Sequence, residues 1–303
     1  MKIALTNVHL DLGAGMRGTN MGPSAIQVAG LIQRLVQEGH DFESVRSCGS
    51  ESFNAREPGA SNARFLPEIS NICEELHERV YNGCHVGALP LVIGGDHSQA
   101  IGAISGLARY HHELSNEDIG VIWVDAHTDM NTPSSSPSGN IHGMPLATLF
   151  GRGPDRLLEV VGNKGLLNPK KVVIMGARDV DSSEIPLVKE LGVRVYPMHE
   201  IDSRGMATCV NEALERVLDA TAGVHLSFDL DGVDPEYAPG VGTPVPGGLS
   251  LRESHLLCES VSSTKKLLGM ELVELNPTLD VRNKTGELAV WLIQSALGKR
   301  ILG

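Results

Sequence analysis

The stretch IGVIWVDAHTD, residues 119–129, indicates the fold of the chain. Its first half is apolar at neighbouring positions, so both faces of the predicted strand would be buried, as in a parallel sheet covered by helices on each side. The stretch then carries Asp125, His127 and Asp129 at every second position. A buried strand that leads into two acids and a histidine predicts either a polar turn or a metal site.

Similar short apolar runs, bounded by Gly, Pro or Asp, recur along the chain. They occupy residues 89–95, 170–179, 192–198, 223–231 and 269–277, and residues 1–13 predict a first strand. Segments with the 3.6-residue spacing of helices occupy 22–39, 209–223 and 285–302. This alternation, without a linker or repeat, predicts an α/β fold: a single three-layer α/β/α domain over residues 1–303, with a mostly parallel sheet.

Composition excludes several classes of function. The 303 residues carry a net charge of −12, which gives no electrostatic basis for binding nucleic acid or an anionic membrane. The N-terminus does not resemble a signal peptide, and no segment approaches the ~18 apolar residues of a membrane span. Five scattered cysteines, without a C-x-x-C pair, favour a reduced, cytoplasmic protein.

Acids and histidines gather after three of the predicted strands. The candidate metal ligands are His97, Asp125, His127, Asp129, Asp229 and Asp231. In open α/β sheets, binding sites form at the carboxyl ends of the strands, and alternate residues of a strand point to one side, so we expect these side chains to converge. Asp234 precedes a proline and is interpreted instead as a turn former.

A bound cation explains the three clusters better than three separate turns do. A single Asp-x-His is more often a turn cap, but clustered carboxylates repel each other and are costly to bury without partners. Four carboxylates and two imidazoles suit a transition metal such as Mn²⁺, and six ligands suit two ions with bridging carboxylates. A close metal pair lowers the pKa of a bridging water and positions it for attack.

Other classes of protein remain as alternatives. The sequence GGDHSQAIG, residues 94–102, lacks the G-x-G-x-x-G spacing of a dinucleotide site. A two-metal phosphoesterase would need basic residues to hold phosphate, and residues 125–145 contain none. A metal-binding or regulatory protein without catalytic activity is a further alternative, which the intact ligand set disfavours.

Three motifs resemble the signatures of the ureohydrolase family, which includes arginase, agmatinase and formiminoglutamase. They are GGDHS (94–98), DAHTDMNT (125–132) and SFDLDGVDP (227–235). The chain ends, residues 17–31 and 274–302, also resemble this family, and the loop 131–145 resembles its arginase version. The resemblance implies that His97, Asp125, Asp129 and Asp229 hold one Mn²⁺. It implies that Asp125, His127, Asp229 and Asp231 hold the other, with two Mn²⁺ per subunit.

The resemblance also implies roles in catalysis and substrate binding. The implied catalytic residues are Asp129, which hydrogen-bonds the bridging hydroxide, His142 as proton shuttle, and Glu274. Asn131, Ser138 and Asn140 would hold the α-carboxylate of the substrate. Asp181, with Glu184 as a weaker partner, would hold its α-amino group. Thr243 and Glu274 would lie near its guanidinium.

Several of these residues also have plain structural interpretations. His142 could be a surface-loop histidine that caps a glycine turn, and Thr243 could be a turn hydroxyl. Glu274 could pair with an internal arginine. Arg178 and Asp179 could simply pair with each other at the surface.

The implied activity is hydrolysis of L-arginine and water to L-ornithine and urea, by attack of a metal-bridging hydroxide on the guanidinium carbon. This would place the chain in arginine metabolism and the urea cycle. The alternative is another ureohydrolase, such as agmatinase or guanidinobutyrase. The resemblance further implies a homo-trimer or homo-hexamer, supported weakly by the segment LRE at 251–253.

Overall fold

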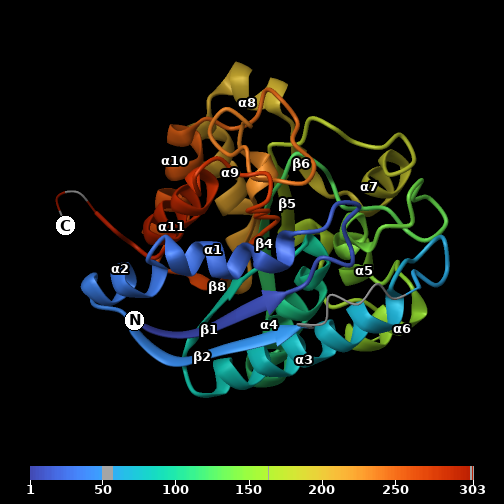
Figure 1. Ribbon diagram of the computed structural model, residues 1–303, viewed down its shortest axis with the longest axis horizontal. Helices are drawn as coiled ribbons and strands as arrows, with labels where there is room; N and C mark the ends of the chain where they lie inside the picture. Colours follow the sequence, from blue (N-terminus) through green and yellow to red (C-terminus); the bar gives the residue numbers. More distant parts are fainter. Residues whose placement is uncertain (50–56, 163, 301, 303) are drawn as a thin grey trace.

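The strands form one eight-stranded sheet in which every strand pairing is parallel (Figure 1). The computed structural model describes residues 1–49, 57–162, 164–300 and 302. The strands, in chain order, are β1 Lys2–His9, β2 Asp41–Gly49, β3 Leu89–Ile93, β4 Asp118–Val124, β5 Val172–Met175, β6 Arg194–Tyr196, β7 Thr221–Asp229 and β8 Leu267–Val273. The predicted parallel sheet is thus confirmed.

The strand order, β2-β1-β3-β8-β7-β4-β5-β6, places the last strand in the middle of the sheet. β8 lies between β3 and β7, where Val92 is opposite Glu271 and Phe228 is opposite Leu272. The sheet therefore joins an N-terminal half, β1 to β3, to a second half, β4 to β7, through a strand near the C-terminus.

Helices cover both faces of the sheet, which confirms the three layers (Figure 1). Along β4, Ile122 and Val124 face one core, and Val121 and Trp123 face the other. The first core is closed by α1 Gly22–Val28, α2 Leu31–Gln37, α8 Met198–Arg204, α9 Met206–Leu218, α10 Leu251–Ser263 and α11 Lys284–Ala296. The second is closed by α3 Leu66–His85, α4 Ala100–Ser115, α5 Pro145–Leu149, α6 Asp155–Val160 and α7 Ile185–Leu191.

Some element boundaries differ from the sequence-based expectation. The helix predicted at 22–39 is two helices, because Gly30 adopts a left-handed conformation with φ of 85° between them. The helix predicted at 209–223 begins earlier and ends at Leu218, since Thr221 already belongs to β7. The helix predicted at 285–302 ends at Ala296, and its residue Ile301 lies outside the described residues.

None of the helices in the described part of the chain is both long and apolar enough to cross a membrane. The five cysteines are buried as free thiols. Burial raises the pKa of the Cys48 and Cys84 thiols to about 12, so both are protonated at neutral pH.

Candidate metal centre and pocket

The candidate ligands lie at the carboxyl ends of β3, β7 and β4, three of the four strands in the middle of the sheet. β3 leads into a 3-10 turn, His97–Gln99, which Asp96 caps by accepting a hydrogen bond from the backbone N–H of Ser98. Asp229 is the last residue of β7, and Asp231 lies in the 3-10 turn Leu230–Gly232 that follows. Because the strands are parallel, their carboxyl ends meet at one edge of the sheet.

The segment after β4 brings Asp125, His127 and Asp129 together, although not by the strand alternation that the sequence suggested. β4 ends at Val124, and the three residues lie in an irregular loop. Asp129 adopts a left-handed conformation with φ of 51°, which is uncommon for a residue with a side chain. The convergence therefore depends on loop geometry.

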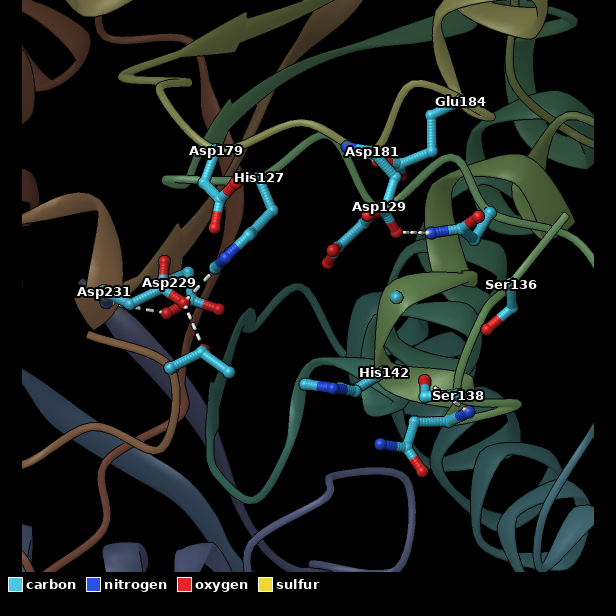
Figure 2. Close-up of a pocket in the computed structure, with 14 residues that line it drawn as sticks. His127, Asp129, Ser136, Ser138, His142, Asp179, Asp181, Glu184, Asp229 and Asp231 are labelled. Carbon is cyan, nitrogen blue, oxygen red and sulfur yellow. Dashed lines mark hydrogen bonds and ion pairs between the residues drawn. The ribbon is translucent and has the colours of Figure 1, made fainter. Parts of the chain in front are cut away.

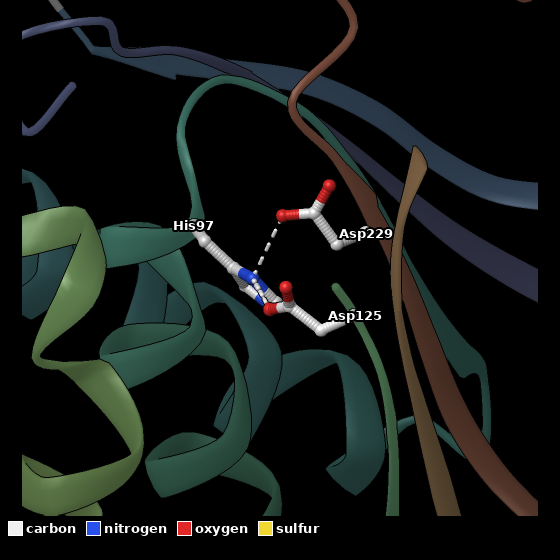
Figure 3. A group of neighbouring side chains, drawn as sticks. All are labelled: His97, Asp125 and Asp229. Carbon is white, nitrogen blue, oxygen red and sulfur yellow. Dashed lines mark ion pairs between the residues drawn. The ribbon is translucent and has the colours of Figure 1, made fainter. Parts of the chain in front are cut away.

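His97 lies at the centre of the first cluster (Figure 3). Its Nδ1 is 3.2 Å from Oδ2 of Asp125 and 3.1 Å from Oδ2 of both Asp129 and Asp229. In the second cluster, Nδ1 of His127 is 3.2 Å from Oδ1 of Asp125 and 3.2 Å from Oδ2 of Asp231. Asp125 belongs to both clusters, so they are adjacent.

Two groups in these clusters have the donor atoms and the spacing to hold a metal ion: His97, Asp125 and Asp229, and Asp125, His127 and Asp231. In each group the donor atoms lie within 4.8 Å of one another. Nδ1 of His97 is buried without a hydrogen-bond partner, although three carboxylates surround it. An imidazole nitrogen and hard oxygens suit a divalent ion of the Mn²⁺ type, so the residues fit the expected metal.

The electrostatics of the centre also favour a cation. Burial raises the pKa of Asp129 to about 7, with a further contribution from the charge of Asp125. Burial and the charges of Asp231 and Asp125 raise the pKa of Asp229 well above its ordinary value. Without a cation the cluster therefore retains protons, and a bound metal ion would displace them.

The predicted ligands are held by a second layer of hydrogen bonds. Trp123 donates from Nε1 to Oδ2 of Asp125 over 2.9 Å, and its ring stacks on His97 with 4.0 Å between the ring centroids. Nε2 of His97 lies 2.9 Å from Oγ of Ser227. Such contacts fix the orientation of metal ligands. Neither Trp123 nor Ser227 was predicted, because apart from their positions near the ligands nothing in the sequence distinguishes them.

His142 and Glu274 contact each other beside the metal centre. Nδ1 of His142 lies 3.2 Å from Oε1 of Glu274, which also accepts a hydrogen bond from the backbone N–H of His97. Burial alone would lower the pKa of His142, but Glu274, followed by Asp129 and Asp96, raises it to about 9. Glu274 thus pairs with a histidine and a backbone amide rather than with the internal arginine considered above.

A cavity of about 140 Å³ opens over the metal centre (Figure 2). Its lining residues are His127, Asp129, Asn131, Ser136, Ser138, Asn140, His142, Gly143, Asp179, Asp181, Glu184, Asp229, Asp231 and Thr243. Six of these are acids, and none is a lysine or an arginine among the residues that the structure describes. Such a cavity suits a small cationic ligand and disfavours a phosphoester.

The predicted substrate-binding residues lie together in this lining, except for Glu274. Nδ2 of Asn131 donates to Oδ2 of Asp181 over 2.9 Å. Glu184 is buried and accepts hydrogen bonds from the backbone N–H groups of Met130 and Asp181, at 2.7 and 3.1 Å. Ser136 and Asp179 also line the cavity and were not predicted, since the Ser-rich loop gives no signal that separates one serine from another.

Three nearby residues test the structural interpretations. Asp234 accepts hydrogen bonds from the backbone N–H groups of Glu236, Gly247 and Gly248, as expected for a turn former. Arg178 does not form the expected surface pair with Asp179: its side chain is half-buried and donates to backbone carbonyls instead. Thr243 is more than a turn hydroxyl, because its Oγ1 donates to Oδ2 of Asp231 over 2.8 Å.

The fold and these clusters define an α/β protein with a candidate two-ion metal centre at the carboxyl edge of a parallel sheet. Residues 1–298 match the model of the Arginase family. The chain belongs to the arginase family.

Relatives and solved structures match the chain over nearly its whole length. The arginase of Bacillus subtilis (strain 168) is 45% identical over 303 residues, with 99% of each chain covered. The structure of arginase from Bacillus caldovelox has a TM-score of 0.93 at 43% identity and covers 99% of both chains. That of arginase from Bacillus cereus has a TM-score of 0.91 at 42% identity, over 99% of this chain and 100% of the other.

Proposed function

We propose that the protein hydrolyses L-arginine to L-ornithine and urea with the help of two divalent metal ions, expected to be Mn²⁺. The observation that carries this proposal is a small acidic cavity over a buried carboxylate–imidazole cluster. The negative lining suits a guanidinium cation. Membership of a family whose relatives are arginases supports the same substrate.

The proposed holders of the first ion are His97, Asp125, Asp129 and Asp229, and those of the second are Asp125, His127, Asp229 and Asp231. When bound, the ions supply a nucleophile by lowering the pKa of water, and they supply positive charge that stabilises the transition state. The chain contributes the rigid surroundings: Trp123 and Ser227 fix His97 and Asp125, and Thr243 fixes Asp231.

The residues beside the metal centre are proposed to handle the proton and the guanidinium. His142 is protonated at neutral pH in the metal-free protein, since Glu274 raises its pKa, and it lines the cavity. It is therefore suited to deliver a proton to the leaving amine of ornithine. Asp129, Glu274 and Thr243 are proposed to orient the nucleophile and the guanidinium.

The rim of the cavity is proposed to select the amino-acid end of the substrate. Asn131, Ser138 and Asn140 can donate hydrogen bonds to an α-carboxylate. Asp181, which is exposed at the rim, can accept from an α-amino group, whereas Glu184 mainly supports the backbone of Asp181 and Met130. Agmatine lacks the α-carboxylate and would leave the amide and hydroxyl groups of the loop without a partner.

One assay tests the proposal against the other ureohydrolases. Mn²⁺-loaded protein is incubated separately with arginine, agmatine and guanidinobutyrate, and urea is measured. We expect arginine to be the preferred substrate. Preference for agmatine would indicate an agmatinase, and metal binding without urea from any of the three would indicate a protein without this catalytic activity.

The variant Asp181→Ala sharpens the test of the rim. It should reduce turnover of arginine far more than any residual turnover of guanidinobutyrate, because guanidinobutyrate has no amino group for Asp181 to bind. An equal loss for both substrates would contradict the proposed contact.

We further propose that residues 1–303 act as one catalytic domain of a cytoplasmic homo-trimer or homo-hexamer. The single continuous sheet supports a single domain. The free cysteines support a reducing compartment such as the cytoplasm. Light scattering after gel filtration would measure the oligomeric state.

A further inference from the structure

Arg178 uses its whole guanidinium to bind backbone carbonyls near the metal centre. It follows β5 by three residues, and its side chain is half-buried. Its Nε donates to Val245 O at 3.0 Å; Nη1 donates to Gly176 O and Gly232 O at 3.2 and 3.1 Å; and Nη2 donates to Asp231 O and Val245 O at 2.7 and 2.6 Å. These bonds occupy the five N–H groups of an arginine.

Three of the four acceptor residues belong to two segments that carry proposed functional residues, and the fourth, Gly176, follows β5 directly. Asp231 and Gly232 form part of the turn after β7, and Val245 lies in the loop that contains Thr243. Thr243 connects the two segments by donating to the carboxylate of Asp231. Arg178 therefore fixes the backbone of a proposed metal ligand and the backbone of the loop that orients this ligand.

Arg178 also links these segments to the loop after β4. Its backbone N–H donates to Ala126 O over 2.8 Å, and the N–H of Ala126 donates to Oδ1 of Asp231 over 3.1 Å. Asp231 is thus held at its carbonyl by Arg178 and at its two carboxylate oxygens by Ala126 and Thr243. The ends of β4, β5 and β7 meet in one hydrogen-bonded unit.

The chemistry of the unit requires an arginine rather than any cation. A guanidinium is planar, with five N–H groups in a fixed fork, so it can serve carbonyls from three segments at once. A lysine carries three donors at one point and cannot span the same acceptors. Gly176, Gly232 and Val245 lie far apart in the sequence, and the guanidinium of Arg178 binds the carbonyl group of each.

We propose that Arg178 is a positioning residue that holds Asp231 and Thr243 in the geometry needed to bind the metal ion of the second cluster and to orient the guanidinium of the substrate. The effect on substrate turnover rests on the proposed function. The effect on metal affinity requires only that the second cluster, Asp125, His127 and Asp231, binds a metal ion.

The test compares Arg178→Lys, which keeps the charge, and Arg178→Met, which keeps much of the volume, with the unsubstituted protein. Isothermal titration of metal-free protein with Mn²⁺ should show that one of two ions binds roughly 10- to 100-fold more weakly in both variants. At saturating Mn²⁺, kcat for arginine should fall more than KM rises, because Asn131 and Asp181 at the rim do not contact Arg178.

A matched control is Arg194→Lys. Arg194 is a half-buried arginine that binds Glu200 and the backbone of Val195, and it is the first residue of β6, at the amino end of the strand and away from the metal centre. This control should bind both ions normally. Thr243→Val, alone and combined with Arg178→Lys, measures the coupling: the two losses of metal affinity should be clearly non-additive, since both residues act on Asp231.

The proposal is overturned if Arg178→Lys binds both ions as the unsubstituted protein does, or if its effect adds independently to that of Thr243→Val. Failure of both Arg178 variants to fold, judged by circular dichroism, would also overturn it, because the arginine would then serve the fold as a whole. Failure of the proposed function is distinguishable: the unsubstituted protein would release no urea from arginine, while the metal titrations would remain interpretable.

Discussion

The substitution Glu274→Gln removes the carboxylate whose Oε1 lies 3.2 Å from Nδ1 of His142. Two unit charges at about 3.2 Å attract each other by roughly 5 kcal/mol at an effective dielectric constant of about 20. Burial opposes this attraction, and the net result is a pKa of about 9 for His142, compared with its ordinary 6.5. This difference corresponds to about 3 kcal/mol, so removing the Glu274 charge should return the pKa toward 6.5.

The pKa is measured by an NMR titration of His142 in metal-free protein, since a bound cation would itself change the titration. Because the pKa of His142 is raised in the folded protein, its interaction with Glu274 stabilises the fold fully below pH 6.5. This stabilisation is lost as the pH rises through about 9. The difference in unfolding free energy between the unsubstituted protein and the variant should shrink over this pH range. Asp181→Asn, at the rim, should leave the titration unchanged. If His142 still titrates near pH 9 in Glu274→Gln, the reasoning is refuted.

Two further outcomes concern the metal centre. Mn²⁺ at about 100 times its Kd should stabilise the fold by about 2.7 kcal/mol per site and raise the Tm by roughly 5–10 °C. Asp125→Asn should lose this rise in thermal melts, and an undiminished rise would contradict a shared ligand. Trp123→Phe removes the donor to Oδ2 of Asp125 and should lower the unfolding free energy by about 1–3 kcal/mol in urea titrations. The control Trp291→Phe, at an exposed position, should change it much less, and equal losses would contradict the role of the indole N–H.

The central strands were predictable because they are buried on both faces. β4 ends in a continuous apolar run that Asp125 follows directly, and β7, although it contains His225 and Ser227, is almost wholly buried and ends in Asp229. The edge strand β2 was missed, since its residues are exposed or half-buried apart from Cys48 and the sequence DFESVRSCG carries no apolar run. The division of the first predicted helix at Gly30 depends on one left-handed residue, which a 3.6-residue pattern does not reveal.

The candidate ligands were predictable by residue type and position, but their geometry was not. Asp129 reaches the cluster through a left-handed backbone conformation rather than along a strand. The position of Arg178 shows the same limit: a guanidinium that binds carbonyls from several segments has the same sequence signature as one that pairs with its neighbour Asp179. Tertiary contacts decide between the two.

The central position of β8 constrains the synthesis of the protein. Residues 267–273 are synthesised after all the other strands, yet they provide the pairing that joins β3, already paired with β1, to β7, already paired with β4. His97 belongs to the first half of the sheet, and Asp125 and Asp229 belong to the second. A nascent chain that stops before β8 would therefore contain all six proposed ligands, but it would expose two unpaired inner strand edges, and the strand that connects the two halves would be missing. We therefore expect the metal centre to assemble only after β8 has joined the half that carries His97 to the half that carries Asp125 and Asp229.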